Sequence, residues 1–453
     1  MALFKSKIGL IAATVGSAVG LGTVWRFPAE VQANGGAAFL IVYAAFAFIL
    51  GVPIMLSEFA LGRGTHSDAI TAFRRMSPHS GWWSFGAIAV VASFLIMCFY
   101  MVVGGWTLEY FVQTLTGDLY GGLSAAADTD ICDTYFTLKM QQYVASDWAP
   151  ALFTVGFVAL NLIVLLGGVA KGIERMANVA MPLLFVLLVA FCVVSLSLPG
   201  SADGLRFFLE PDFSKITPTV LINALGQALF SLSLGMGILI TYSAYYPDDT
   251  RLGRTSVIVV MLTLLVAVLM GLVIFPAVAS FGLMDHGLSG TTLVFITLPE
   301  VFRNLPGTEF WSGLFFLLLM VSALTSPVSL AEVTVLFLHE PFHIKRTPAV
   351  LITLCPIFVL AGICAMSFGP LADIKIFGNV IFDALDNFTS NYMLPVAALG
   401  TCLFMGWFVP KGFMYGELTN RGTLRSWLNP VAIFVVRWFA PIAIAIILIS
   451  NLV

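Results

Sequence analysis

Long apolar stretches recur along this 453-residue chain and constrain its fold more than any other feature. Each is about 20 residues or longer, the length of helix that crosses the hydrocarbon core of a bilayer. A soluble domain has no reason to carry such stretches, so the sequence predicts an all-α polytopic membrane protein with eleven transmembrane helices. The expected spans are 8–33, 37–62, 83–114, 149–167, 173–198, 218–246, 254–284, 309–339, 347–369, 375–408 and 427–451.

Charged residues are scarce and are sorted by loop. They make up 10% of the chain, and a net charge of −3 without a basic face excludes nucleic acid as a partner. Lys and Arg concentrate in alternate loops, which the positive-inside rule places in the cytoplasm. The N-terminus is therefore expected inside the cell and the C-terminus outside, in a multi-pass protein of the cell membrane. The basic loops carry Lys5, Lys7, Arg63, Arg74, Arg75, Lys171, Arg175, Arg251, Arg254, Lys345, Arg346, Lys411, Arg421 and Arg425.

Two spans are interrupted by glycines at corresponding places, in 16–22 of the first and 231–237 of the sixth. Such pairs are typical of inverted repeats whose broken helices free backbone groups for a zwitterion and a cation near the midplane. Glu58 is expected to bond some of these freed N–H groups. The alternative is that the glycines only allow close helix packing. The pattern predicts one domain, 1–453, made of repeat one at about 8–198, repeat two at about 218–408 and an extra helix at about 427–451.

Several motifs resemble the neurotransmitter:sodium symporter family. The chain reads GSAVGLGTVWRFP from Gly16 to Pro28 and PIMLSEFALGR from Pro53 to Arg63. The resemblance extends along nearly the whole chain, and the span count is similar to the bacterial amino-acid branch. It implies a LeuT-like fold and sodium-coupled amino-acid symport by alternating access, which is not an enzyme activity. Further matching landmarks are Gly105-Trp106-Thr107, Lys171-Gly172-Ile173-Glu174-Arg175, Ile240-Thr241-Tyr242 and Leu324-Thr325-Ser326.

The resemblance implies a sodium site between the first and eighth spans. Its ligands would be the carbonyls of Gly16, Val19 and Ser322 and the hydroxyls of Thr325 and Ser326. A hard monovalent cation needs several neutral oxygens, which freed carbonyls and adjacent hydroxyls supply. Left alone, the two hydroxyls would bond back to their own helix, as is common in membrane helices.

A further sodium site would use Ala18, Thr23, Ser231 and Thr263 with the carboxylate of the substrate. Bacterial relatives usually place asparagine where Thr23 and the seventh-span residue stand, and 254–284 contains no asparagine. That span also lacks an acid before its end. The sequence therefore leaves open one or two sodium ions, and it leaves chloride dependence open.

The substrate site implied by the resemblance lies at both broken spans. N–H groups near Leu21 and Gly22 would hold the carboxylate with Tyr100, and carbonyls of both breaks would hold the amino group. No charged side chain faces the expected substrate side chain, which favours a hydrophobic or aromatic amino acid. The alternative is ordinary helix packing. The implied residues are Ser17, Ala18, Gly20, Leu21, Gly22, Ile96, Tyr100, Phe230, Ser231, Ser233, Met236, Ser326 and Leu330.

Gates and a hinge are implied in the same way. Arg26 and Asp386 are costly inside a membrane and would close above the substrate, with a structural salt bridge as the alternative. Glu340 would be an inner-gate acid. Gly172 and Pro182 would let the cytoplasmic half of the fifth span unwind, because proline removes a backbone hydrogen bond; a static kink is the alternative.

Two rival functions have some support. His339-Glu340-Pro341-Phe342-His343 matches H-E-x-x-H, the zinc-binding pattern of metalloproteases, but Pro341 would disturb the helix that gives both histidines one face. The six cysteines contain no CxxC pair and suggest neither disulfides nor a zinc site. The second rival is a sensor of the same fold that binds an amino acid without moving it.

Overall fold

The protein is a membrane bundle built almost entirely of helices. The computed structural model describes residues 4, 6–20, 22–121, 129–284, 293–410, 412–424 and 428–452, and in 129–145 it describes side chains from residue 135 onward. Within these residues, nine helices are long and apolar enough to cross a membrane. They are Ala37–Thr65 (α3, Ala37–Phe46, and α4, Val52–Thr65), α6 (Trp83–Thr116), α8 (Ala149–Leu166), Val169–Leu196 (with α9, Glu174–Leu196), α13 (Leu252–Ser280), α16 (Thr308–His339), Arg346–Phe368 (with α17, Arg346–Ala365), Ile381–Phe408 (α18, Ile381–Phe388, and α19, Leu394–Leu403) and Leu428–Ser450 (α21, Leu428–Phe434, and α22, Ala440–Ser450).

The first and sixth expected spans are broken. α1 (Lys7–Ala18) is followed by a π-helical turn, Gly22–Arg26, and α2 (Phe27–Ala33), and the two parts are bent by 51°. The sixth span is divided into α11 (Pro218–Ser231) and α12 (Ile238–Ala244), each too short to cross a bilayer. By length and composition the described residues provide up to ten crossings, so the count of eleven stays a prediction.

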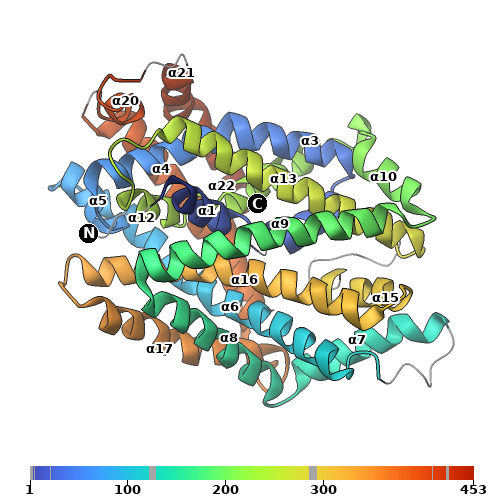
Figure 1. The fold of residues 1–453 in the computed structure, drawn as a ribbon. Coiled ribbons are helices and arrows are strands. Elements are labelled where there is room, and N and C mark those ends of the chain that lie inside the picture. Colours follow the sequence, from blue (N-terminus) through green and yellow to red (C-terminus); the bar gives the residue numbers. More distant parts are fainter. Residues whose placement is uncertain are drawn as a thin grey trace.

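The helices run side by side, and the connecting segments gather at two ends (Figure 1). The N-terminus, α5 (Ala69–Met76) and α20 (Phe413–Leu418) lie at one end. α7 (Thr129–Ala145), α10 (Ser201–Leu209) and α15 (Leu298–Arg303) lie at the other. The basic loops that the structure describes therefore share one end, as a single membrane orientation requires.

Local signals explain where the helices begin. Ser6 caps α1 by accepting the Gly9 N–H at 2.9 Å, and Thr217 caps α11, where Pro218 occupies the first turn.

Between the helices the core is aromatic: the ring centroids of Trp106 and Tyr110 on α6 lie 5.8 and 5.0 Å from that of Phe295. These contacts join the segment Leu293–Thr297, which contains Phe295, to the centre of the bundle.

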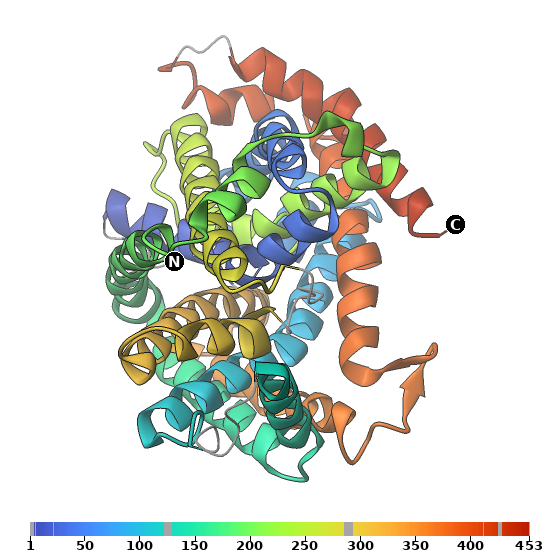
Figure 2. The ribbon, with the colours of Figure 1, turned by 90° about the vertical axis from the view of Figure 1, so that its right-hand side faces the viewer.

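One predicted boundary is wrong. The tenth span was expected to begin at residue 375, but its helix begins at Ile381. Residues 375–380 instead form an antiparallel hairpin of Lys375–Ile376 (β1) and Asn379–Val380 (β2), seen at the edge of the bundle in orange in Figure 2. Phe377 and Gly378 both have positive φ, 51° and 83°, which matches a two-residue hairpin turn. Apolar residues in this hairpin made it resemble the start of a helix.

We expect Gly62→Ala to destabilise the bundle. A Cβ at Gly62 on α4 would lie 2.0 Å from the backbone oxygen of Ile240 on α12, which cannot move without shifting that helix. Overpacking of this kind costs about 1–3 kcal/mol, and it should lower the thermal midpoint of the purified protein in detergent. Gly362→Ala is the control, because a Cβ there meets no atom within 4 Å. Equal midpoints for the two variants would contradict the close α4–α12 contact.

Candidate functional site

Side chains from elsewhere satisfy the carbonyls that the first break exposes. The carbonyl of Ser17 accepts hydrogen bonds from the hydroxyls of Ser233 at 2.9 Å and Ser326 at 3.2 Å. The carbonyl of Val19 accepts one from the Ser322 hydroxyl at 3.0 Å. These contacts bring α16 and the second break against the first break, so that polar oxygens of three segments meet inside the bundle.

The second break uses backbone conformations that favour glycine. Between α11 and α12, Ser233, Gly235 and Gly237 have φ of 56°, 75° and 72°. A Cβ at Gly235 would lie 2.4 Å from the carbonyl oxygen of Leu394, so glycine is required there for space as well as for conformation. The unwound turn therefore packs directly on α19.

Two polar side chains hold this turn in place. Glu58 is fully buried on α4, and its Oε1 accepts the Gly235 N–H at 2.8 Å. The expected bond from Glu58 to a freed backbone N–H is confirmed. Ser93 on α6 donates to the carbonyl of Met236. Ser93 was missed by the sequence analysis, although a lone serine in an apolar span is a signal that could have found it.

A small cavity lies where the two breaks meet. Its volume is about 20 Å³. One water molecule needs about 10–15 Å³ of such space, so this conformation has no room for an amino acid. Leu21 lies outside the described residues and Ser231 does not line the cavity, whereas Ile238 does so without having been predicted. The predicted residues that line it are Ser17, Ala18, Gly20, Gly22, Ile96, Tyr100, Phe230, Ser233, Met236, Ser326 and Leu330.

Phe230 closes one side of this cavity. Its ring lies so near Gly22 that a Cβ there would come within 2.7 Å of it, and the Gly22 N–H donates to the Tyr100 hydroxyl at 3.2 Å. The guanidinium of Arg26 lies over the Phe230 ring at 4.7 Å and 3.8 Å from Glu30. The ring and the cation together cover the cavity.

The predicted partner of Arg26 lies apart from it in this conformation. Asp386 accepts a hydrogen bond from the Ser390 hydroxyl at 2.8 Å. Among the residues that the structure describes, no ion pair joins Arg26 to Asp386. Ser390 and Arg26, together with Phe230, line one further cavity of about 70 Å³, so both arms of the predicted gate lie near the same space.

The ligands expected for the first sodium site lie together. α1 and α16 approach so closely that a Cβ at Gly16 would be 3.4 Å from Cβ of Thr325. The Thr325 hydroxyl donates to the Ser322 carbonyl of its own helix at 2.8 Å, which is the alternative noted from the sequence. The Ser326 hydroxyl instead reaches across to the first span. The side chains of Ser322, Thr325 and Ser326 on α16 thus lie beside the end of α1.

The other expected sodium ligands bond one another or their own helix. The Thr23 hydroxyl donates to the Ala18 carbonyl at 2.9 Å. The Thr263 hydroxyl donates to the Val259 carbonyl, one turn earlier on α13, at 2.9 Å. Threonine hydroxyls commonly bond in this way in membrane helices. In this conformation Thr263 therefore directs its hydroxyl toward its own helix.

Two polar residues that the sequence analysis missed lie beside this group. The hydroxyls of Tyr43 and Ser231 are 2.8 Å apart. Gln227 Nε2 donates to the Gly22 carbonyl at 3.0 Å. Both are buried; the Tyr43 bond joins α3 to the end of α11, and the Gln227 bond joins α11 to the first break. A polar residue on an apolar helix could have indicated each of them.

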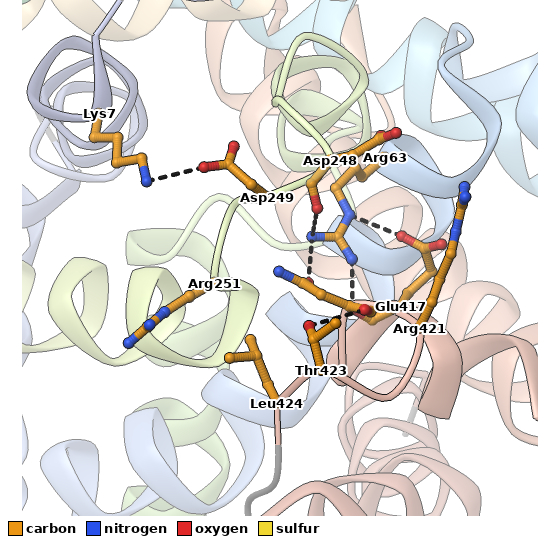
Figure 3. Close-up of a pocket in the computed structure, with 10 residues that line it drawn as sticks. Lys7, Arg63, Asp248, Asp249, Arg251, Glu417, Arg421, Thr423 and Leu424 are labelled. Carbon is orange, nitrogen blue, oxygen red and sulfur yellow. Dashed lines mark hydrogen bonds and ion pairs between the residues drawn. The ribbon is translucent and has the colours of Figure 1, made fainter.

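Ion pairs close the end of the bundle where the basic loops gather (Figure 3). Arg63 is buried, and it bonds Glu417 at 2.7 Å and the Thr250 carbonyl at 2.6 Å. Lys7 pairs with Asp249 at 3.0 Å in the same region. Together with their neighbours these residues line a polar cavity of about 580 Å³.

Glu340 has a partner that the sequence analysis did not find. Its carboxylate pairs with Arg75 of α5 at 2.8 Å and accepts the Asp68 N–H at 2.9 Å. Asp68 in turn caps α5 by accepting the N–H groups of Ile70 and Thr71. Burial, with a contribution from the nearby Glu340 charge, raises the pKa of Asp68 above its usual value.

The zinc-binding arrangement is not formed. α16 ends at His339, and His343 has a positive φ of 52°, so the two histidines do not share a helical face. His339 Nδ1 lies 2.7 Å from the Ile344 carbonyl. Within the described residues no group of three or more His, Cys, Asp or Glu side chains could hold a metal ion.

The expected hinge residues lie at an irregular helix start. Gly172 is in a π-helical turn, Val169–Ile173, and Pro182 lies inside α9. A Cβ at Gly172 would be 2.0 Å from the Val164 carbonyl oxygen. Glu174, directly after the turn, accepts the Ser6 N–H and hydroxyl at 3.1 and 2.9 Å. The start of the fifth span is therefore bound to the N-terminal segment.

Comparisons with known proteins agree on one family. The model of the sodium:neurotransmitter symporter family matches residues 2–149 and 137–453. An uncharacterised sodium-dependent transporter of Bacillus subtilis, YhdH, is 37% identical over 99% of this chain and 97% of its own length. An uncharacterised sodium-dependent transporter of Haemophilus influenzae is 36% identical over 99% of this chain and 98% of its own length. Among solved structures, the crystal structure of MhsT in complex with L-phenylalanine is similar to this one with a TM-score of 0.90. The two sequences are 37% identical, and the match covers 100% of each chain.

We expect Asp68→Asn to stabilise the protein more at neutral than at acidic pH. The raised pKa means that folding binds protons, so wild-type stability falls as the pH rises from the unfolded pKa of about 3.9 through the folded one. Asparagine keeps the cap and removes the buried charge. The thermal midpoint of the variant should exceed that of the wild type at every pH above the unfolded pKa, and the difference should be largest at pH values above the folded pKa of Asp68. A gain independent of pH, or the same gain for Asp203→Asn on α10, would contradict this.

Proposed function

Because this chain belongs to the sodium:neurotransmitter symporter family, we propose that it carries hydrophobic or aromatic amino acids into the cell together with sodium. The observation that carries the proposal is the cavity at the two breaks. Its backbone groups suit the two charged ends of an amino acid, while Ile96, Met236 and Leu330 offer only apolar surface to a side chain. The phenylalanine named in the MhsT structure supports an aromatic substrate.

The sodium ion is proposed to lie between α1 and α16. Its ligands are the carbonyls of Gly16, Val19 and Ser322 and the hydroxyls of Thr325 and Ser326, whose mutual contacts support this arrangement. The second site, with Ala18, Thr23, Ser231 and Thr263, requires more change. There the Thr263 hydroxyl must leave the Val259 carbonyl before it can face an ion.

Transport is proposed to follow alternating access. Substrate entry requires Phe230 to move away from Gly22, and Arg26 and Asp386 then close above the bound substrate. On the other side, release requires the Glu340 contacts to open and the Gly172–Pro182 segment to unwind. Proline inside α9 lowers the cost of unwinding, because the helix already lacks one hydrogen bond there.

The same proposal includes the finer topology. It comprises eleven spans, counting the α1–α2 and α11–α12 pairs as one each, in inverted repeats at about 8–198 and 218–408 with an extra helix at about 427–451. The two breaks at corresponding positions support the repeats. The basic end of the bundle is assigned to the cytoplasm, which places the C-terminus outside.

Uptake by proteoliposomes tests the function. Labelled leucine and tryptophan are offered to purified protein with and without an inward sodium gradient, and unlabelled amino acids serve as competitors. Concentrative uptake that needs sodium supports the symporter and ranks its substrates. Binding without flux would replace it with a sensor.

Two substitutions separate the ion site from the substrate site. Ser326→Ala should raise the sodium concentration for half-maximal uptake by about tenfold, because losing one oxygen ligand costs about 1–3 kcal/mol. Phe230→Ala should chiefly change the ratio of leucine to tryptophan uptake, because it removes apolar contact with the substrate side chain. Initial rates over a sodium series measure the first effect, and competition curves measure the second.

Thr334→Ala is the matched control for Ser326→Ala. Thr334 lies on the same helix and does not line the cavity. Its loss should leave the sodium dependence unchanged. Unaltered sodium dependence in Ser326→Ala, together with unaltered selectivity in Phe230→Ala, would refute the site.

A further inference from the structure

An apolar groove lies on the membrane-facing side of α4, α13 and α21. Its volume is about 580 Å³. One wall carries Phe48 and Ile49, another Val257 and Ile258, and a third Val431. Phe48, Ile49 and Val431 are each more than 40% exposed, so the groove is open toward lipid. We call it the α4–α13–α21 groove.

The end of the groove toward the basic loops is positively charged. Arg251 and Arg254, at the start of α13, both line it and are exposed. Within the part of the chain that the structure describes, neither guanidinium has an ion-pair or hydrogen-bond partner. Figure 3 shows Arg251 pointing away from Arg63 and its partner Glu417. No acidic residue is among the described residues that line the groove.

A buried amide also lacks a partner in this groove. Asn429 on α21 lines it and is only 6% exposed. Its Nδ2 is buried and has no hydrogen-bond acceptor among the described residues. A buried donor without an acceptor is costly, and such groups generally have a partner from protein, water or ligand. Asn429 therefore points independently to a ligand with oxygen atoms.

We propose that the α4–α13–α21 groove binds an anionic phospholipid from the leaflet beside the basic loops. Its phosphate lies at Arg251 and Arg254, which match a phosphate with charge-assisted hydrogen bonds. An ester or phosphate oxygen accepts from Asn429, and an acyl chain lies along the apolar walls. Basic pockets between membrane helices at this depth are suited to anionic headgroups.

Charge complementarity favours a lipid over a second copy of this chain. In a two-fold dimer the same surface meets itself, so Arg251 and Arg254 of one copy would approach the same arginines of the other. A zwitterionic lipid would bring a cation beside both arginines. An anionic lipid satisfies the two arginines and the amide together.

Native mass spectrometry of the purified protein tests this. Phosphatidylglycerol and phosphatidylcholine with identical acyl chains are titrated in detergent, without sodium or amino acid, so the result does not depend on the proposed transport. We expect preferential binding of phosphatidylglycerol, and weaker binding as the ionic strength rises. Arg251→Gln with Arg254→Gln should weaken it about 25-fold, since each arginine near the surface contributes about fivefold.

Two further variants make the test specific. Asn429→Leu should weaken phosphatidylglycerol binding without changing charge. Arg421→Gln should not, because Arg421 lines the neighbouring polar cavity and not the groove. If the double variant does not fold, weaker phosphatidylglycerol binding by Arg254→Gln alone and the salt series on the wild type test the same role of the arginines. Equal binding of both lipids, unchanged binding in the arginine variants, or a lipid-free dimer through this face would overturn the proposal.

Discussion

A backbone group without a partner is far more costly inside a bilayer than in water, and this constraint governs the centre of the molecule. Each of the two breaks removes several helical hydrogen bonds at the depth where no water replaces them. Glu58, Ser93, Gln227, Ser233 and Ser326 restore partners to the freed groups. Because these side chains come from five segments (α4, α6, α11, the second break and α16), the breaks can exist only where the segments converge. The position of the cavity follows from that requirement.

Two oxygens that take part in stabilising the first break, the Val19 carbonyl and the Ser326 hydroxyl, are also proposed to bind sodium, which has an energetic consequence. In this conformation the Ser322 and Ser326 hydroxyls donate to carbonyls of the first break. A cation placed among them would attract the carbonyl and hydroxyl oxygens alike, so each hydroxyl proton would have to turn away. Ion binding therefore exchanges existing hydrogen bonds for coordination, and its net free energy is a small difference between two large terms. Small displacements of α1 against α16 can then change ion affinity strongly.

Hydropathy predicted most of the fold because crossing a bilayer demands long apolar helices whatever their partners are. It failed at residues 375–380, where Ile376 and Phe377 are apolar but form a hairpin. Contacts between distant segments were harder to predict: nothing near Glu340 in the sequence indicates Arg75, 265 positions away. The residues around the cavity were found from motifs, whereas Ser93 and Tyr43 act on the breaks from other helices and carry no motif. Whether Arg26 meets Asp386 depends on conformation, which composition does not encode.

The contacts at the basic end of the bundle differ in strength, and this suggests an order of opening. Lys7 and Asp249 are 76% and 68% exposed, and ion pairs so open to water contribute little. Arg63 and Glu417 are 2% and 15% exposed, and separating them would leave a buried charge without its partner. In the proposed transport cycle, release toward this end would therefore begin with the N-terminal segment leaving Asp249 in the loop before α13, while Arg63 keeps α4, α20 and that loop together. A lipid phosphate at Arg251 would act beside Asp249 and Thr250, on the fixed part of this arrangement.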